Sequence, residues 1–219
     1  MSLAIFDLDN TLLAGDSDHS WGEFIIGKDI ADAISYRQRN NQFYTDYQNG
    51  SLDIHAYQEF VLQPLAAFTL EELAELHLEF METTIVGMML PRAPELIEKH
   101  RAQGDTLLII TATNRFVTEP IAKKLGVDNL LATEPEIINQ RYTGKIIGVP
   151  CFQYGKVKRL EKWLNEHRLG LEGAWFYSDS ANDLPLLNVV DHPVAVDPDE
   201  KLERVAREKN WPIISLRQG

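Results

Sequence analysis

Cysteine is nearly absent from the sequence, which has a single residue of this type, Cys151, among 219. One thiol excludes an internal disulfide framework and a metal site built from several cysteines. Because a lone cysteine behaves mostly as a small apolar residue, we expect Cys151 to be packed in the interior.

Long apolar segments are also missing. No stretch approaches the ~18 apolar residues of a transmembrane helix. The chain also starts at Met1 without the charged and apolar segments of a signal peptide. We therefore expect a cytoplasmic protein with no membrane partner.

Basic charge is scarce as well. The chain has 21 lysine and arginine residues against 33 aspartate and glutamate residues, which gives a formal net charge of −12. Nucleic acids and anionic membranes need a clustered basic face, and the sequence contains no such cluster. We therefore expect no nucleic-acid partner, and the sequence says nothing of oligomeric state.

The first strand is the strongest positive feature. The apolar run Leu3-Ala4-Ile5-Phe6 leads directly into Asp7, and Asp9 follows two residues later. This pattern predicts a buried parallel strand that places two carboxylates at its C-terminal edge. Open α/β sheets hold their chemistry at that edge.

Helical periodicity dominates residues 18 to 88. We expect Asp18 and Ser51 to cap helices, and Thr69-Leu70-Glu71-Glu72 is a capping box that predicts another. The methionine and aromatic residues of this segment recur at helical spacing, so we expect them to form the core of a small bundle.

Strands and helices alternate from Pro91 onward. The expected strands cover residues 106–111, 130–133, 174–177, 193–196 and 213–214, and a hairpin is expected over 137–147 with its turn at Tyr142-Thr143-Gly144. Helices are expected between them, for example from Gly155 onward. This alternation predicts an α/β fold with a Rossmann-like, doubly wound parallel sheet.

The helical segment interrupts this α/β pattern directly after its first strand. Roughly seventy residues are far more than a normal strand-to-helix connection needs. We predict a core domain of residues 1–15 and 89–219 and an inserted helical cap domain of residues 16–88. The expected role of the cap is a lid, and a purely structural appendage is the alternative.

Polar side chains gather where the predicted strands end. They are Asp7, Asp9, Thr111, Thr113, Asn114, Asp179 and Asp183, and Lys156 opens the helix between the last two strands of this set. Four carboxylates at one edge repel one another unless a cation binds. An all-oxygen ligand set favours Mg²⁺ over zinc, and Mg²⁺ with Lys156 would hold a phosphoryl group.

Four motifs resemble those of the haloacid dehalogenase (HAD) superfamily of phosphohydrolases in order and spacing. They are Asp7-Leu8-Asp9-Asn10-Thr11, the strand ending in Thr111, Lys156, and Asp179-Ser180-Ala181-Asn182-Asp183. With its second aspartate, the first motif resembles that of the superfamily's phosphatases more than that of its dehalogenases. A helical cap after that motif resembles subfamily I with a C1 cap, in its phosphoserine-phosphatase-like branch.

The resemblance implies a role for each catalytic residue. Asp7 would be the nucleophile that becomes an aspartyl phosphate, and Asp9 the general acid and then the general base. Thr111 would donate a hydrogen bond to a phosphoryl oxygen, and Lys156 would offset negative charge. The implied Mg²⁺ ligands are Asp7, the backbone carbonyl of Asp9, Asp179, and Asp183 either directly or as a support.

The sequence also departs from the branch. Ser178 stands where a glycine usually precedes the last motif, and Thr111-Ala112-Thr113 replaces Ser-Gly-Gly. Both changes weaken phosphoserine as the substrate. Asp16 stands where phosphoserine phosphatases have a glutamate, and this shorter acid leaves room for a bulkier amine or a different polar group. The predicted substrate-binding residues are Asp16, Asp18, Thr113 and Asn114, with simple helix capping as the alternative for the two aspartates.

The expected function is Mg²⁺-dependent hydrolysis of a small phosphorylated metabolite, with phosphoserine or histidinol phosphate as examples of an amine-bearing substrate. Further candidate substrate contacts are Arg37, Arg39, Arg92 and Arg115, with surface positions as the alternative. Three other functions stay open: phosphoryl transfer to an acceptor other than water, a receiver-like regulatory phosphoacceptor, and an inactive binding protein. A receiver would leave the cap unexplained.

Overall fold

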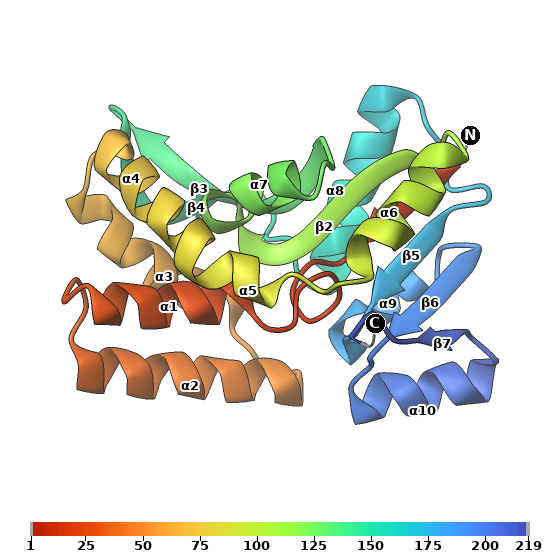
Figure 1. Ribbon diagram of the computed structural model, residues 1–219, viewed down its shortest axis with the longest axis horizontal. Helices are drawn as coiled ribbons and strands as arrows, with labels where there is room; N and C mark the ends of the chain where they lie inside the picture. Colours follow the sequence, from red (N-terminus) through yellow and green to blue (C-terminus); the bar gives the residue numbers. More distant parts are fainter. Residues whose placement is uncertain (1, 218–219) are drawn as a thin grey trace.

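The computed structural model of the protein describes residues 2–217. Within that range, seven strands form one sheet in the order β4-β3-β2-β1-β5-β6-β7 (Figure 1). The strands are β1 (Leu3–Phe6), β2 (Thr106–Asn114), β3 (Asn129–Ile138), β4 (Arg141–Ile147), β5 (Trp175–Ser178), β6 (His192–Val196) and β7 (Ile213–Ile214). All neighbours pair in parallel except β3 and β4, which are antiparallel. The predicted doubly wound α/β sheet is confirmed.

Helices cover the sheet and extend beyond one end of it. They are α1 (Ser17–Gly27), α2 (Ala33–Asn49), α3 (Ile54–Leu62), α4 (Leu70–Phe80), α5 (Val86–Met88), α6 (Ala93–Ala102), α7 (Arg115–Lys124), α8 (Tyr154–His167), α9 (Leu184–Leu187) and α10 (Glu200–Lys209). A 3₁₀ turn follows α3 (Gln63–Ala67), another precedes α9 (Ala181–Asp183), and a π-helical turn (Met81–Ile85) joins α4 to α5. None of the helices in residues 2–217 has the length and apolar character needed to cross a bilayer.

The side chains of β1 alternate between two cores because successive residues of a strand point to opposite faces. Ala4 and Phe6 join the core that contains α6, α7 and the helices before α5. Leu3 and Ile5 join the core under α8, α9 and α10. Since both faces of β1 are covered, the end of this strand is held rigidly, and so is the Asp7 that follows it.

The elements between Ser17 and Met88 are all helical and lie beside β3 and β4 (Figure 1). The two segments that join them to the sheet run side by side: the Ala14 N–H donates to the Met88 carbonyl at 2.6 Å, and the Leu90 N–H donates to the Leu12 carbonyl at 3.2 Å. The division into a core and a cap at residues 16–88 stays a prediction, and this paired connection is compatible with a hinge.

Two expected helix caps are wrong. Asp16, not Asp18, caps α1, because its side chain accepts from the His19 N–H, while Asp18 lies inside the first turn. Asp53, not Ser51, caps α3. The capping box at Thr69 and Glu72 is confirmed. An aspartate accepts the backbone N–H groups of a first turn readily, and in both cases an aspartate two residues from the expected position forms the cap.

The expected turn of the hairpin at Tyr142-Thr143-Gly144 is also wrong. The chain reverses at Asn139 and Gln140, whose φ angles are 51° and 59°. Two successive residues with positive φ are typical of a type I′ turn, in which asparagine is favoured. Gly144 lies within β4 instead, where a Cβ atom would stand 3.5 Å from the Gln63 backbone.

Glu134 on β3 joins two helices on opposite faces of the sheet. Its carboxylate accepts from Arg115 of α7 at 2.8 Å and from Arg159 of α8 at 2.9 Å. Burial raises the pKa of Glu134, but the two guanidinium groups outweigh burial and leave the pKa below its ordinary value. Glu134 is therefore ionised throughout the neutral range and ties the two layers together.

Replacing Glu134 with glutamine is expected to lower the free energy of unfolding by roughly 1–2 kcal/mol at pH 7, since the pairs are partly buried. The folded pKa lies below the unfolded one, so this stabilisation is present above the unfolded pKa, near ~4.3, and is lost as pH falls through the folded pKa. Urea unfolding at pH 7 and pH 3 measures it. The control is Glu166→Gln, an exposed partner of Lys162. If wild type and Glu134→Gln differed in unfolding free energy as much at pH 3 as at pH 7, the result would contradict an ionic origin of this stabilisation.

Candidate active site

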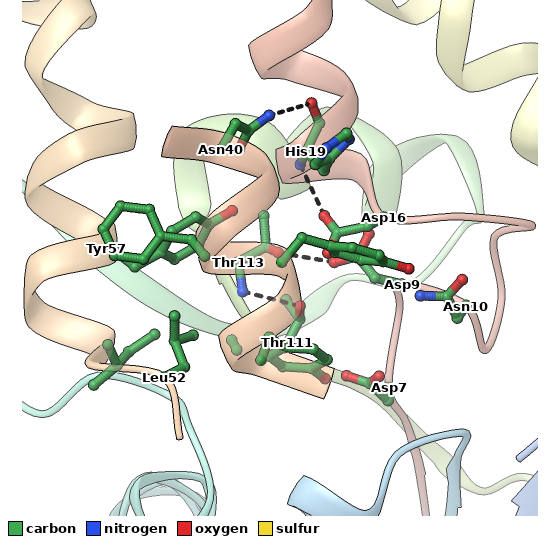
Figure 2. A pocket seen from close by; sticks show the side chains of 15 residues that line it. Asp7, Asp9, Asn10, Asp16, His19, Asn40, Leu52, Tyr57, Thr111 and Thr113 are labelled. Atoms are coloured by element: carbon green, nitrogen blue, oxygen red, sulfur yellow. Dashed lines mark hydrogen bonds between the residues drawn. The ribbon is translucent and has the colours of Figure 1, made fainter. Parts of the chain in front are cut away.

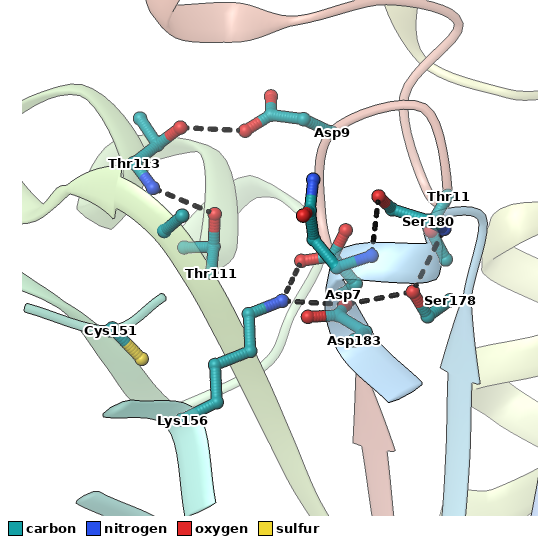
Figure 3. Close-up of polar contacts among 12 residues, drawn as sticks. Asp7, Asp9, Thr11, Thr111, Thr113, Cys151, Lys156, Ser178, Ser180 and Asp183 are labelled. Atoms are coloured by element: carbon teal, nitrogen blue, oxygen red, sulfur yellow. Dashed lines mark hydrogen bonds and ion pairs between the residues drawn. The ribbon is translucent and has the colours of Figure 1, made fainter. Parts of the chain in front are cut away.

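Asp7 stands at the centre of the C-terminal edge of the sheet. It follows β1, which lies between β2 and β5. At this position the strand order of the sheet reverses, and doubly wound sheets bind their ligands beside such a point. Its N–H donates to the Tyr177 carbonyl at 2.9 Å. The residue is 4% exposed, and its Oδ1 accepts from Lys156 Nζ at 2.8 Å (Figure 3).

Lys156, in the first turn of α8, joins two carboxylates. Its Nζ donates to Asp183 Oδ2 at 2.7 Å as well as to Asp7. Burial alone would lower the pKa of Lys156, but Asp183 and Asp7 raise it further, so the net shift is upward and the group stays charged. Ser178 Oγ donates to the same Asp183 oxygen at 2.7 Å. The serine that departs from the family pattern therefore holds Asp183, and Asp183 holds Lys156.

Both oxygens of Asp9 are held by neighbours. Oδ1 accepts from the Ser17 N–H at 2.7 Å. Oδ2 accepts from Thr113 Oγ1 at 2.8 Å, the bond drawn in Figure 3. Burial and the Asp16 carboxylate raise the pKa of Asp9 to about 6, against the lowering effect of these two hydrogen bonds. A carboxyl group with a pKa near neutrality can both donate and accept a proton at physiological pH.

Asp179 is fixed by Thr11 through a reciprocal pair of hydrogen bonds. Thr11 Oγ1 donates to Asp179 Oδ1 at 3.0 Å and accepts from the Asp179 N–H at 3.0 Å. Burial and the Asp7 carboxylate raise the pKa of Asp179 well above its ordinary value. Residues separated by most of the chain are thus held together at the edge of the sheet.

The charges at this edge do not balance. Asp7, Asp179 and Asp183 bring three carboxylates against the single ammonium of Lys156. A divalent cation would offset the remaining charge and keep the carboxylates ionised, so the donor set fits Mg²⁺. Among residues 2–217, no three acid, histidine or cysteine side chains are grouped so that they could hold a metal by themselves. Backbone carbonyls and water would have to complete such a site.

A pocket extends from this edge toward the helices. Figure 2 shows Asp7, Asp9, Thr111 and Thr113 around it, with Asp16 beside Asp9, Tyr57 beside Thr113, and His19 and Asn40 near Asp16. The remaining lining residues are Asn10, Phe43, Tyr44, Tyr47, Leu52, Ile54 and Ala112. In the described part of the chain, neither lysine nor arginine lines this pocket. Acidic and aromatic groups dominate its wall.

The predicted substrate-binding residues separate into two pairs. Asp16 and Thr113 line the pocket. The structure does not bring Asp18 and Asn114 to it: Asn114 Nδ2 donates to Asp18 Oδ1 at 3.2 Å, and both side chains are buried. This hydrogen bond joins α1 to the end of β2, so the pair positions the wall of the pocket instead of forming it.

The four candidate arginines lie elsewhere. Arg37 pairs with Glu23 at 2.8 Å, Arg92 donates to the Ser215 carbonyl, and Arg115 pairs with Glu134. Arg39 lies over the Phe43 ring, 4.3 Å from its centroid. The alternative interpretation, surface residues, fits these positions better than substrate contact.

Several residues that form the site were not among the predicted site residues. Thr11 ends the first motif and Ser178 directly precedes the last one, and both could have been found by asking which hydroxyl groups lie beside the aspartates. The pocket residues of α2, such as Asn40 and Tyr44, lie in the segment predicted to be helical, but no separate helix was predicted there. Cys151 is buried, as expected.

A model of the haloacid dehalogenase-like hydrolase family matches residues 4–188. The chain belongs to this family. The match covers both the strand that carries Asp7 and the turn that carries Asp179. The predictions of a HAD enzyme and of its fold are therefore confirmed, and the receiver alternative loses its support.

Two relatives in the family cover nearly all of the chain. A histidinol-phosphatase of Neisseria meningitidis serogroup C (strain 8013) is 46% identical over 220 residues, with 99% of each chain covered. A phosphoserine phosphatase of Mycobacterium tuberculosis (strain ATCC 25618 / H37Rv) is 29% identical over 217 residues, which cover 98% of this chain and 70% of that one.

Two solved structures support the fold. A protein of unknown function from Bordetella pertussis Tohama I superposes with a TM-score of 0.92 at 42% identity, with 98% of each chain covered. A phospho-aspartyl intermediate analogue of a phosphoserine phosphatase superposes with a TM-score of 0.72 at 17% identity, over 99% of this chain and 94% of that one. At that identity the likeness concerns the fold alone.

Proposed function

We propose that this HAD-family phosphatase hydrolyses a small amine-bearing phosphomonoester in a Mg²⁺-dependent reaction that passes through an aspartyl phosphate on Asp7. The observation that carries the proposal is the meeting of Asp7, Lys156, Asp9 and Asp179 at the mouth of an acidic, aromatic pocket. The family match and the phosphatase relatives support the reaction type.

Asp7 is the proposed nucleophile. Its free oxygen forms a bond to phosphorus while the bond between phosphorus and the leaving oxygen breaks, which splits one difficult displacement into two steps. Lys156 and the Thr111 hydroxyl would hold phosphoryl oxygens during both steps. Asp7, Asp179 and the Asp9 carbonyl would hold Mg²⁺, which when bound neutralises phosphoryl charge and orients the oxygens for in-line attack.

Asp9 is the proposed proton carrier. It would give a proton to the leaving alkoxide in the first step and take one from the attacking water in the second, which releases inorganic phosphate and restores Asp7. The pKa of about 6 suits both directions. Ser17 and Thr113 hold the carboxyl in place between the two steps.

The pocket wall favours an amine without a carboxylate. Phosphoserine carries a carboxylate that calls for a cationic partner, and the described lining of the pocket has neither lysine nor arginine. Asp16 can pair with an ammonium group, and the aromatic residues Phe43, Tyr44 and Tyr57 line the pocket, where a cation or a flat ring can pack against them. Histidinol phosphate, an amino alcohol phosphate with an imidazole ring, fits both features, and the name of the N. meningitidis relative agrees.

A phosphate-release assay tests the function. Histidinol phosphate, phosphoserine and p-nitrophenyl phosphate are compared with Mg²⁺ and with EDTA. We expect kcat/KM for histidinol phosphate to exceed that for phosphoserine by about 10²-fold or more, the effect of an unpaired buried carboxylate. No turnover of any of the three would overturn the proposed activity. A preference for phosphoserine would overturn the substrate class alone. Free alcohol appearing without equimolar phosphate would indicate phosphoryl transfer.

Replacing Asp16 with asparagine is expected to lower kcat/KM for histidinol phosphate by about 10–10²-fold, because the ammonium group loses its charged partner. Asparagine caps helices as well as aspartate, so α1 should persist. Hydrolysis of p-nitrophenyl phosphate, which has no amine, is the internal control. Asp16 also raises the pKa of Asp9, so an effect on proton transfer is shared by both substrates, and the loss for histidinol phosphate should exceed the loss for p-nitrophenyl phosphate by about tenfold or more. Equal losses for both substrates would contradict a specific contact with the amine.

A further inference from the structure

A chain of side-chain hydrogen bonds joins three separate segments next to the candidate active site. Gln153 Nε2, just before α8, donates to Asn182 Oδ1 at 3.1 Å. Asn182 Nδ2 in turn donates to the backbone carbonyl of Tyr47, near the C-terminal end of α2, at 2.9 Å. The amide of Asn182 is thus used on both sides, and α2 is attached to the edge of the sheet.

The backbone of Gln153 is in a conformation that few residues adopt. Its φ and ψ angles are 48° and −120°, a combination that suits glycine and strains a residue with a Cβ atom. The turn around it is tight: a Cβ atom on Gly155 would stand 2.0 Å from the Pro150 carbonyl oxygen. Strain of this kind persists only where contacts with the surrounding structure hold the residue in that conformation. The Gln153 side chain donates its hydrogen bond to Asn182.

Asn182 is itself well placed to transmit the contact. The Asn182 N–H donates to Ser180 Oγ at 3.2 Å, so the amide side chain projects from a fixed turn directly before Asp183. On the α2 side of this hydrogen-bond chain, Gly50 has a φ of +74°, and a Cβ atom there would stand 3.6 Å from Asn182 Oδ1. The end of α2 therefore approaches Asn182 closely.

Tyr47 is the residue whose place depends on this attachment. It lines the pocket that holds Asp7 and Asp16, and it also lines an outer cleft that contains Asp179 and Ser180. Its ring lies 6.0 Å from the Phe152 ring, next to Gln153. Burial and then the Asp179 carboxylate raise the pKa of the Tyr47 phenol, which therefore stays neutral. Tyr47 stands between the leaving-group pocket and the outer cleft.

We infer that Gln153 is a positioning residue for substrate affinity: through Asn182 it holds the end of α2 so that Tyr47 closes the leaving-group pocket beside the Asp179 carboxylate. The inference rests on the proposed function, because it assigns that pocket to the leaving group. It adds a residue outside the four motifs. It also explains the strained backbone, since glycine at position 153 would relax the turn but release α2.

The test compares Gln153→Gly, Gln153→Ala and wild type with p-nitrophenyl phosphate and Mg²⁺. Both variants lose the donor to Asn182, so we expect KM to rise about fivefold with kcat within about twofold, the loss of one net hydrogen bond. Backbone amide exchange of residues 44–50 is expected to quicken by a similar factor. Glycine also relieves the strain, so its Tm should exceed that of the alanine variant by about 2–4 °C.

Gln140→Gly is the matched control. Gln140 also has a positive φ, 59°, in the β3–β4 turn, so glycine relieves positive-φ strain there without touching α2. Its Tm should rise while KM stays at the wild-type value. Wild-type KM and wild-type exchange at residues 44–50 in both Gln153 variants would overturn the inference. A fall in kcat with unchanged KM would overturn it too, because it would show that the turn serves Lys156. An inactive wild type would instead overturn the proposed function.

Discussion

Replacing Asp7 with asparagine is expected to lower kcat for phosphate release by about 10³-fold or more, because the amide cannot form the phosphoenzyme bond. The fold should persist. Asparagine keeps the size of the side chain and an oxygen that can accept from Lys156. The neutral group also removes a buried carboxylate whose pKa burial raises to about 7. Phosphate release and thermal unfolding of the same preparation measure the two effects.

The control for Asp7→Asn is Asp53→Asn, which makes the same chemical change at the cap of α3 and leaves an asparagine that can still cap the helix. It should retain wild-type activity. Acid quenching of the wild type with labelled substrate should trap phosphate on the protein, and Asp7→Asn should trap none. Hydrolysis by Asp7→Asn at the wild-type rate would exclude the proposed nucleophile. Trapping without turnover in the wild type would revive the phosphoacceptor alternative.

The edge that carries Asp7 could be predicted because parallel strands have a fixed geometry. A buried strand that ends in Asp7, another that reaches Thr111 and a third that precedes Asp179 must deliver these residues to one edge of the sheet. Lys156 follows from the same logic, as the first turn of a helix that starts at that edge. Local pattern and topology were sufficient for all four.

The pocket could not be predicted, because its wall depends on how helices pack and not on their own patterns. α2 lacks a regular apolar stripe, so its periodicity is weak, and Tyr44 and Tyr47 look like ordinary core residues. The structure places other aromatics of the segment, including Trp21 and Phe80, in the core as expected. Which tyrosines face the site is set by contacts such as Asn182 to Tyr47, which join residues 135 positions apart.

The capping errors have a related cause. Asp16 and Asp18 are both good cap residues, and a sequence cannot say which of them faces the first turn. The structure distinguishes them: Asn114 donates a hydrogen bond to Asp18 in the interior, while Asp16 caps the helix and lines the pocket. Asp16 then serves as a helix cap and as a wall residue at once, so the two interpretations that the sequence left open are compatible.

Replacing Lys156 with methionine is expected to reduce both activity and stability. Its Nζ is buried between Asp7 and Asp183, and removing one partner of a buried ionic cluster costs roughly 3–5 kcal/mol. Without the ammonium group, kcat should fall by about 10²–10⁴-fold, because phosphoryl charge loses a fixed partner. Denaturant unfolding and phosphate release at pH 7.5 measure the two losses. Lys158→Met, two residues along α8 on its exposed side, is the control and should stay within about 0.5 kcal/mol of wild type.

A second substitution separates the two roles of Lys156. In Lys156→Met/Asp183→Asn one of the two carboxylates that lose the ammonium group becomes neutral, so part of the lost stability should return, by about 1–2 kcal/mol. Activity should not return, because the asparagine supplies no positive charge to the phosphoryl group. A double variant that is no more stable than Lys156→Met would contradict the view that Lys156 stabilises the fold by offsetting charge at this edge. Recovery of activity with stability would contradict a direct role for Lys156 in catalysis and reduce it to a support for Asp7.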